Sequence, residues 1–377
     1  MLSSMKYKIA VFSGDGVGPE LINEGLKVIE KAAELDKFEI EWIRYPYGAD
    51  HYNDTRELLN EKNLKDIKKN CNAIYCGTFD NSIKKINDIK NFIRTYFDQF
   101  ACLRPIRLLP GVESIIAGKT SNEIDFVIIR ESTEDFYAGG SERIKNGKNK
   151  HQLDINTKTY KIKFGLDIEA KGSEIAYQIG ILSRKGCERI IKYAFEYAKS
   201  KNKKKITAID KSNMLEFYNF WRESVNKISK EYPDIECEFE LVDSAVMNFI
   251  RQPEKYEVIL APNMFGDILS DLGTVMQGNL AFAFRGNINP DEISMFEPAH
   301  GSAPQLKDKG VVNPIATISA GALMLETIGQ QKSSDLIIKA IEAVLKEGKI
   351  RTIDLNGNNS TSEIGDAIKD KLVEIHD

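Results

Sequence analysis

The sequence predicts an α/β fold, because short apolar runs typical of strands alternate with segments of helical periodicity. The strand-like runs are 7–12, 73–76, 126–129, 206–209 and 258–260. The first leads through a glycine-rich turn into a segment of helical periodicity at 18–35. Polar or charged residues follow four of the five runs. Because open α/β sheets bind ligands at the carboxyl ends of their strands, we expect functional residues there.

The chain has 377 residues, enough for two domains at about 100–200 residues each. No linker rich in Pro, Gly or Ser divides it. We expect boundaries near residues 100 and 252, which make one domain discontinuous, 1–100 plus 253–377, and the other 101–252. Residues 141–168 are polar and then alternate, which predicts an exposed hairpin arm. Such an arm cannot bury its apolar face alone, so we expect it to pair with a second subunit.

Composition excludes several classes of function. A net charge of −4 gives no reason to expect a nucleic-acid partner, and the lysine-rich run 199–205 reads as a solvated loop before a strand. No stretch of 18 apolar residues predicts a membrane span, and no apolar N-terminal segment predicts a signal peptide. Five cysteines without a Cys-x-x-Cys pair fit a reducing compartment, so a cytoplasmic location is expected.

The glycine-rich segment 14–18 is not a dinucleotide-binding fingerprint. That motif requires G-x-G-x-x-G, and Pro19 occupies the position of the third glycine. We therefore expect a non-Rossmann fold in which this segment is a tight turn from strand to helix.

Asp267 and Asp271 lie four residues apart, on one face of an expected helix. Like charges at this spacing repel, but a hard divalent cation such as Mg²⁺ or Mn²⁺ would reverse the effect. The alternative is a solvated polar stripe that also contains Ser270 and Thr274.

Other candidates have both functional and structural interpretations. Arginine forks bind carboxylates in bidentate fashion, so three of them together would suit a di- or tricarboxylate, although each alone is more often structural. A lysine directly after a strand could transfer protons, or simply begin a loop. The candidates are Arg94, Arg104, Arg130, Tyr137, Lys211 and His300.

Taken together, these motifs resemble the β-decarboxylating dehydrogenase family of isocitrate, 3-isopropylmalate, homoisocitrate and D-malate/tartrate dehydrogenases. The resemblance runs from Gly14 to the segment 362–368, and it is most specific in 263–271, 297–304 and Asn313-Pro314. It implies an isopropylmalate-dehydrogenase-like fold with a mixed parallel and antiparallel sheet and a dimerisation arm. It assigns the cofactor to the larger domain and the substrate and dimer contacts to the smaller one.

The resemblance also implies a role for each residue. Tyr137 and Lys211 would be the acid–base pair, and Asp243 would join Asp267 and Asp271 as a ligand of Mg²⁺ or Mn²⁺. In a homodimer, or a higher oligomer containing it, Lys211 and Asp243 would reach the partner's site. Substrate carboxylates would be bound by Arg94, Arg104 and Arg130. The nicotinamide cofactor would be bound by His300, Gly301, Ser302, Ala303, Pro304, Gln305 and Asn313.

Departures from the family pattern bear on the substrate. Lys90 and Asn91 stand where isopropylmalate enzymes carry leucines. Lys90 could accept an extra carboxylate, as in isocitrate, but Asp88 would oppose it. Segments 97–100, 104–111 and 211–213 look most like the D-malate/tartrate branch, so we expect that substrate class, with isocitrate, homoisocitrate and 3-isopropylmalate as alternatives.

Cofactor choice and catalytic status are also open to alternatives. NAD-dependent members usually carry Asp at the position of Gln305, whereas Leu306 replaces the tyrosine of NADP enzymes and Lys307 could meet a 2′-phosphate. NAD is therefore favoured over NADP. A non-catalytic regulatory subunit of a heteromeric dehydrogenase would lose some of the arginine, tyrosine, lysine or aspartate set, and here all are retained.

Overall fold

The computed structural model describes residues 5–80 and 84–376. The chain divides into two compact units. Unit 1 comprises Met1–Gln99, Leu103–Asp125 and Leu272–Asp377, and unit 2 comprises Phe100–Cys102 and Phe126–Asp271. Among the described residues, no helix combines the length and apolar character needed to cross a membrane. All five cysteines are free thiols.

Unit 1 contains a mixed sheet. Strand β1 (Lys6–Gly14) lies between β2 (Glu39–Arg44) and β3 (Ala73–Thr78) and runs parallel to both. β14 (Met295–Pro298) continues in parallel beside β3, and β13 (Phe284–Ile288) pairs with β14 in antiparallel fashion. The prediction of a mixed α/β sheet is therefore confirmed.

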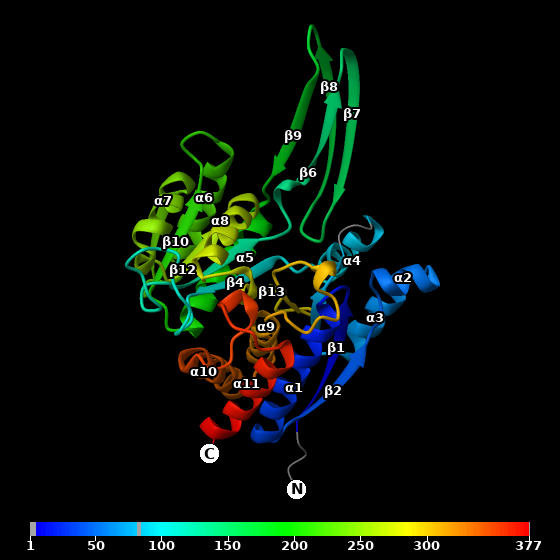
Figure 1. The fold of residues 1–377 in the computed structure, drawn as a ribbon. Coiled ribbons are helices and arrows are strands. Elements are labelled where there is room, and N and C mark those ends of the chain that lie inside the picture. The colour runs from blue at the N-terminus through cyan, green and yellow to red at the C-terminus, as the bar shows by residue number, and fades with distance from the viewer. Residues whose placement is uncertain (1–4, 81–83, 377) are drawn as a thin grey trace. The chain divides into compact units, whose positions relative to one another are not determined.

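Helices cover both faces of this sheet (Figure 1). On one side pack α1 (Gly18–Asp36), α9 (Ile315–Thr327), α10 (Gln331–Glu347) and α11 (Thr361–His376). Helices α3 (Glu61–Asn70) and α4 (Lys84–Tyr96) contribute Leu64 and Ile93 to an apolar cluster, which also contains Phe12 and Ile74 of the sheet. The short helix α2 is Ala49–Thr55.

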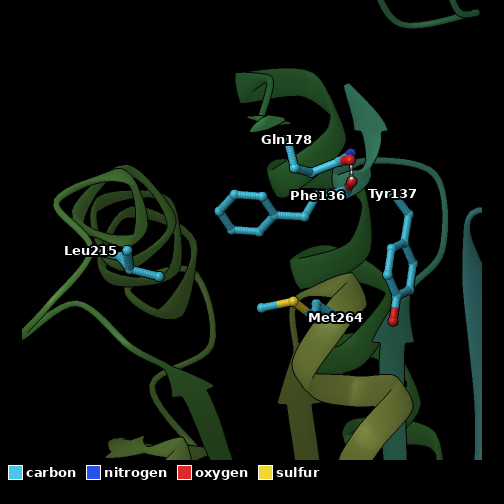
Figure 2. Close-up of a pocket in the computed structure, with 5 residues that line it drawn as sticks. All are labelled: Phe136, Tyr137, Gln178, Leu215 and Met264. Atoms are coloured by element: carbon cyan, nitrogen blue, oxygen red, sulfur yellow. Dashed lines mark hydrogen bonds between the residues drawn. The ribbon is translucent and has the colours of Figure 1, made fainter. Parts of the chain in front are cut away.

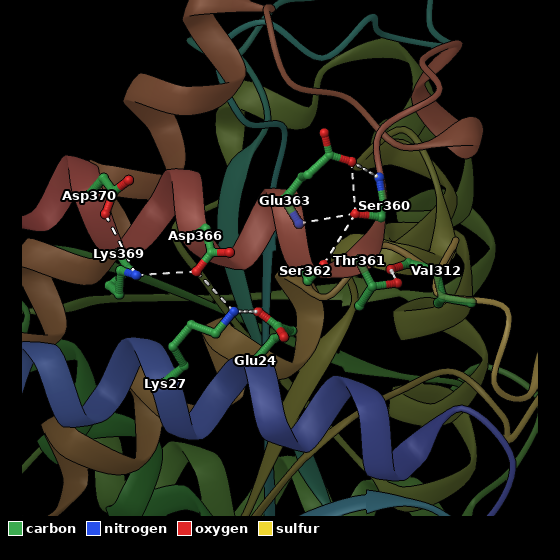
Figure 3. Close-up of polar contacts among 10 residues, drawn as sticks. All are labelled: Glu24, Lys27, Val312, Ser360, Thr361, Ser362, Glu363, Asp366, Lys369 and Asp370. Carbon is green, nitrogen blue, oxygen red and sulfur yellow. Dashed lines mark hydrogen bonds and ion pairs between the residues drawn. The ribbon is translucent and has the colours of Figure 1, made fainter.

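Polar contacts join α1 to α11 (Figure 3). The Lys27 ammonium lies 2.5 Å from Glu24 and 3.1 Å from Asp366 of α11. At the start of α11, the Ser360 backbone N–H donates to the Glu363 carboxylate at 2.7 Å, and the Glu363 N–H donates to the Ser360 hydroxyl at 3.3 Å. This reciprocal cap explains why the helix begins at this point.

Unit 2 contains a parallel sheet and a separate arm. The strand order is β11 (Glu236–Leu241), β10 (Lys205–Asp210), β12 (Val258–Ala261), β5 (Asp125–Glu131). Its helices are α5 (Arg184–Ser200), α6 (Phe217–Ser229), α7 (Val242–Arg251) and the part of α8 (Asn263–Met276) up to Asp271. β4 (Ala101–Arg107) is divided between the two units. Short 3₁₀ turns occupy Pro253–Lys255, Leu280–Phe282, Pro304–Leu306 and Ile353–Leu355.

The arm is longer than the expected 141–168. It consists of β6 (Asp135–Ile144) paired with β9 (Ile175–Ile181) and β7 (Gly147–Asn156) paired with β8 (Lys161–Ala170), all antiparallel (Figure 1). The predicted alternation is confirmed: Leu153 faces Phe164 and Ile155 faces Ile162, in a half-buried apolar row.

The limits of the units differ from the expected boundaries at 100 and 252. Strand β12 lies between β10 and β5, which brings residues 253–271 into unit 2. The segment 103–125 joins unit 1 because Arg107 pairs with Glu342 of α10 at 2.5 Å and the Gly111 carbonyl accepts a hydrogen bond from Arg351 at 2.8 Å. Both differences arise from contacts between residues far apart in the sequence.

The glycine-rich turn between β1 and α1 has the predicted conformation. Gly14 has a φ of 72° and Gly16 a φ of 60°, and Pro19 lies in the first turn of α1. A Cβ at position 14 would lie 1.9 Å from the Thr78 carbonyl oxygen. Only glycine fits there without moving β3.

We predict that Gly14→Ala lowers the free energy of unfolding by at least about 2 kcal/mol, because the left-handed backbone costs about 1–2 kcal/mol and the clash adds to it. Gly118→Ala is the matched control, since Gly118 has a φ of 75° but nothing within 4 Å of the added carbon. Urea unfolding measures both. Equal losses in the two variants would contradict a steric role for Thr78.

Candidate active site

Three of the expected site residues meet in unit 2, at the end of β5. Arg130 is buried and donates to the Asn263 side-chain oxygen from Nε at 2.9 Å and from a terminal nitrogen at 2.7 Å. Its other terminal nitrogen forms an ion pair with Asp267. The Tyr137 hydroxyl donates to the second Asp267 oxygen at 3.2 Å. Arg130, Tyr137 and Asp267 therefore form one hydrogen-bonded group.

The four polar residues of α8 do not form one solvated stripe. Asp267 and Asp271 lie on successive turns of the helix, as predicted, and are respectively half-buried and exposed. Ser270 and Thr274, by contrast, are buried, and the Ser270 hydroxyl donates to the Asp267 carbonyl at 2.7 Å. The alternative of a polar stripe formed by all four residues is thus wrong.

Lys211 and Asp243 form a second pair in unit 2. Lys211 follows β10 and Asp243 lies in the first turn of α7, and their side chains form an ion pair. They meet because β10 and β11 are parallel neighbours whose ends, Asp210 and Leu241, are in register. Asp210 is buried and accepts hydrogen bonds from Arg222 and from the Ser212 backbone N–H, which fixes the loop that carries Lys211.

The helix carboxylates suit a hard divalent cation. Mg²⁺ is commonly held by one or two protein carboxylates, with water and substrate completing its shell, and Asp267 and Asp271 offer that donor set. Asp243 pairs instead with Lys211. Within residues 5–80 and 84–376, no three His, Cys, Asp or Glu side chains gather as a metal cluster.

An apolar pocket of about 600 Å³ lies beside Tyr137 in unit 2 (Figure 2). Its lining comprises Phe136, Tyr137, Gln178, Leu215 and Met264. The Gln178 amide donates to the Phe136 carbonyl at 2.5 Å and ties β9 to β6. Burial, the negative charge of Asp267 and its hydrogen bond raise the pKa of Tyr137, so its hydroxyl is protonated at neutral pH.

The expected cofactor loop, 297–304, lies in unit 1 beside the glycine-rich turn. The Val17 N–H donates to the Ser302 carbonyl at 2.9 Å. His300 Nδ1 donates to the Gly301 carbonyl at 3.0 Å, and burial lowers the pKa of its ring, so His300 is neutral at physiological pH. Pro304 and Gln305 are exposed, whereas Ala303 is half-buried with a φ of 39°.

Asn313 is buried, and both ends of its amide are engaged in the structure. Its oxygen accepts from the Ile315 N–H at 3.0 Å, which caps α9, and its nitrogen donates to Asp354 at 3.1 Å. The structure therefore gives Asn313 a structural role at the start of a buried helix, beside the role in cofactor binding implied by the resemblance.

Lys90 on α4 has a partner that the sequence does not predict. Its ammonium forms an ion pair with the fully buried Glu297, which also accepts from Arg285 at 2.8 Å and Asn287 at 3.0 Å. Burial alone would raise the pKa of Glu297, but Arg285 and Lys90 outweigh it and lower that pKa far below its usual value. Lys90 and Arg285 thus share one buried carboxylate within unit 1.

The remaining expected substrate residues lie on different elements. In unit 1, Asn91 is exposed, Arg94 is half-buried on α4, and Arg104 is buried on β4. The side chain of Asp88 lies outside the described part of the chain.

A group of buried acids was missed from the sequence. Glu131, Glu134 and Asp135 follow Arg130 directly and are all buried. Glu131 accepts from the Thr133 and Glu134 N–H groups, each at 2.8 Å, and Glu134 accepts from the Ser183 N–H at 2.7 Å. Three acids within five residues after a buried strand were the available signal.

Comparisons with known proteins place this fold among oxidoreductases that decarboxylate hydroxy acids. The family model "Isocitrate/isopropylmalate dehydrogenase" matches residues 8–368, and the chain belongs to that family. It is 35% identical to the D-malate dehydrogenase [decarboxylating] of Escherichia coli, over 98% of each chain. It is 33% identical to the 3-isopropylmalate dehydrogenase of Thermobifida fusca, over 99% of each chain.

A solved structure supports the same conclusion. The isocitrate dehydrogenase of Methylococcus capsulatus superposes with a TM-score of 0.81 at 31% identity, and the match covers 97% of this chain and 99% of that one. The family and the α/β fold expected from the sequence are both confirmed. The relatives differ in substrate at nearly equal identity, so overall similarity does not select one substrate.

We predict that Glu131 makes the stability of the protein depend on pH. Burial, reinforced by the charge of Glu134, raises the pKa of Glu131 from 4.5 to about 7. The folded state then holds a proton that the unfolded state releases, so the free energy of unfolding falls as pH rises from about 4.5 to 7.

Glu131→Gln removes this titration. Between pH 5 and 8, the unfolding free energy of the wild type should fall relative to that of the variant by about 1–3 kcal/mol, since each pKa unit is about 1.4 kcal/mol. Urea unfolding at pH 5, 6, 7 and 8 measures the difference. Parallel pH profiles would refute the assignment to Glu131.

Proposed function

We propose that this chain catalyses the metal-dependent oxidative decarboxylation of a 2-hydroxy dicarboxylic acid of the D-malate/tartrate type, with hydride transfer to NAD. The observation on which we base this choice of substrate is the ion pair between Lys90 and the buried Glu297. Position 90 is where isopropylmalate enzymes resemble one another in carrying leucine. A paired ammonium cannot provide an apolar lining for an isopropyl group, because removing it from its partner would leave Glu297 less compensated.

The same pair argues against a third carboxylate at this position. A free lysine would attract the extra carboxylate of isocitrate, but the Lys90 ammonium is already ion-paired with Glu297, which it shares with Arg285. An added anion would be repelled by Glu297 while it competed for Lys90. A smaller or hydroxylated C3 substituent meets neither objection, since the ammonium retains other N–H donors for a hydroxyl group.

The proposed catalytic roles are those that the family resemblance implies, and the chemistry of the residues fits them. Arg94, Arg104 and Arg130 would bind the substrate carboxylates, Lys211 would accept the C2 hydroxyl proton, and bound NAD would supply the acceptor for the C2 hydride. Carbon dioxide then departs, the electrons of the broken bond form an enol(ate), and Tyr137 donates a proton to its carbon. The raised pKa of Tyr137 supports that role, because the donor must be protonated at neutral pH.

The metal would be held by Asp267 and Asp271 together with Asp243 of a second subunit. It would stabilise negative charge on the C2 oxygen. The absence of a three-acid cluster among the described residues of one chain supports a shared site. A homodimer, or a higher oligomer that contains it, would also cover the half-buried apolar row of the arm.

NAD is proposed over NADP because Lys307 is already paired. Its ammonium lies 2.7 Å from Asp50, which would oppose a 2′-phosphate. Gln305 is exposed and uncharged.

The test of this function is a panel of D-malate, tartrate, isocitrate, homoisocitrate and 3-isopropylmalate, each with NAD and NADP. With Mg²⁺ or Mn²⁺, the purified chain should give its highest kcat/KM on D-malate or tartrate with NAD, and excess EDTA should abolish turnover.

Lys211→Met should lower kcat at least about 100-fold, because a general base contributes that much. Lys204→Met, in the solvated basic run, is the control and should keep wild-type activity. A chain that binds these acids but turns none over would instead be a regulatory subunit.

We predict that Lys90→Leu combined with Asn91→Leu raises kcat/KM for 3-isopropylmalate relative to D-malate. Burying an isopropyl group against leucine is worth about 1.5–3 kcal/mol, or about 10- to 200-fold in discrimination. Asn91→Leu alone is the matched control, because it keeps the Lys90–Glu297 pair and should gain much less. Steady-state kinetics on both acids measures the ratio. A wild type that already prefers 3-isopropylmalate would contradict the role given to Lys90.

A further inference from the structure

We propose that Asp135 is a positioning residue, whose single carboxylate sets the start of α8 and of α6 against the strand that carries Tyr137. This inference rests on the proposed function, because it concerns how Tyr137 and the helix carboxylates are placed for that reaction. Asp135 is fully buried at the first position of β6. It contacts neither substrate nor cofactor in the proposed reaction.

The Asp135 carboxylate joins two helices. One oxygen accepts from the Met264 backbone N–H of α8 at 2.9 Å, and the other accepts from the Tyr218 hydroxyl of α6 at 3.0 Å. Met264 is the second residue of α8, so its N–H has no acceptor within the helix. Asp135, on strand β6, therefore caps the first turn of α8.

A second bond strengthens this attachment. The Asn263 amide donates to the Glu134 carbonyl at 3.0 Å, immediately beside the bond between Met264 and Asp135. Asp267 lies three residues after Met264, and Tyr137 lies two residues after Asp135. The hydrogen bond from Tyr137 to Asp267, 3.2 Å long, closes a ring of contacts between β6 and α8. The spacing of the proton donor and the metal-binding helix thus depends on Asp135.

The backbone at position 135 favours glycine, asparagine or aspartate. Asp135 has a φ of 68°, a left-handed conformation that costs a non-glycine residue about 1–2 kcal/mol. Glycine would remove that cost but would also remove both hydrogen bonds. The persistence of strain beside a site is expected where the surrounding structure needs the side chain.

The link to α6 extends to the loop that carries Lys211. Tyr218 is fully buried, and its backbone N–H donates to the Leu215 carbonyl at 2.9 Å. The Leu215 N–H in turn donates to the Lys211 carbonyl at 3.0 Å. Figure 2 shows Leu215 and Met264 on opposite sides of the apolar pocket whose wall includes Tyr137. The two helix starts are therefore held to one carboxylate.

Two substitutions separate positioning from simple stability. Asp135→Gly accepts the backbone conformation and loses both bonds. Asp135→Asn tolerates the same conformation, keeps an oxygen for Met264 and can donate its N–H to the Tyr218 oxygen. We expect the Gly variant to lose about 10- to 100-fold in kcat with a smaller change in KM for D-malate, because displacement of about 1 Å has that effect. The Asn variant should lie within about threefold of the wild type.

Binding of Mn²⁺ supplies a readout other than activity. With D-malate present, titration of free Mn²⁺ followed by electron paramagnetic resonance should give a Kd at least about fivefold higher for the Gly variant than for the wild type or the Asn variant. Circular dichroism establishes that each variant is folded. Wild-type kcat and wild-type Mn²⁺ binding in a folded Gly variant would overturn the proposal.

Tyr218→Phe and Tyr256→Phe form a matched pair that decides the question if the Gly variant does not fold. Both remove a buried hydroxyl that donates to a carboxylate, since Tyr256 donates to Glu240 at 2.8 Å. We expect similar losses of stability, but only Tyr218→Phe should lower kcat, by about three- to tenfold. Equal kcat in the two variants would count against Asp135.

The failure of this inference is distinguishable from failure of the proposed function. If the wild type turns over a substrate and the folded Asp135→Gly variant has the same kcat and Mn²⁺ affinity, only the positioning role of Asp135 is rejected. Absence of turnover by the wild type on every acid of the panel rejects the proposed function, and the ratio of Mn²⁺ affinities between the Gly and Asn variants then decides the role of Asp135. A wild type that binds no Mn²⁺ rejects both.

Discussion

The bonds of the Arg130 guanidinium to Asn263 and Asp267 are the contacts on which unit 2 depends. A buried guanidinium is stable only when its donors are paired, since an unpaired buried charge costs several kcal/mol. Arg130 therefore fixes the end of β5 against the start of α8. The bond from Tyr137 to Asp267 then follows from where that helix begins.

Sequence reasoning succeeded where the determinant was local. The apolar runs predicted the strands, and the four-residue spacing placed Asp267 and Asp271 on one helix face. It failed where the determinant was a distant partner. Nothing near Lys90 indicates that it pairs with Glu297, and nothing near Ser270 indicates that its polar side chain is buried. The domain limits differ for the same reason, because pairing of β12 with β5 is decided by strands far apart in the chain.

The two units stabilise their buried carboxyl groups in different ways. Glu297 is held ionised by two cations, which lowers its pKa, and it thereby fixes the charge balance around Lys90. Glu131 is held mainly by N–H and hydroxyl groups, so burial raises its pKa instead. In the proposed function, the cation-paired acid would lie where the charge of the substrate is selected. Glu131 and Glu134, which accept hydrogen bonds from backbone N–H groups, hold the shape of the turn that follows β5.

The assignment of these residues to two units suggests how the substrate can vary within the family while the catalysed reaction stays the same. In the proposed function, the acid–base residues and the metal-binding helix belong to unit 2, whereas Lys90 belongs to α4 in unit 1. Its neighbours Ile89 and Ile93 pack in the apolar cluster of unit 1. In that proposal, a substitution at position 90 would change the charge near the C3 substituent and leave the bonds of Arg130 and Asp135 in place. Relatives that act on different acids at nearly equal identity are consistent with that separation.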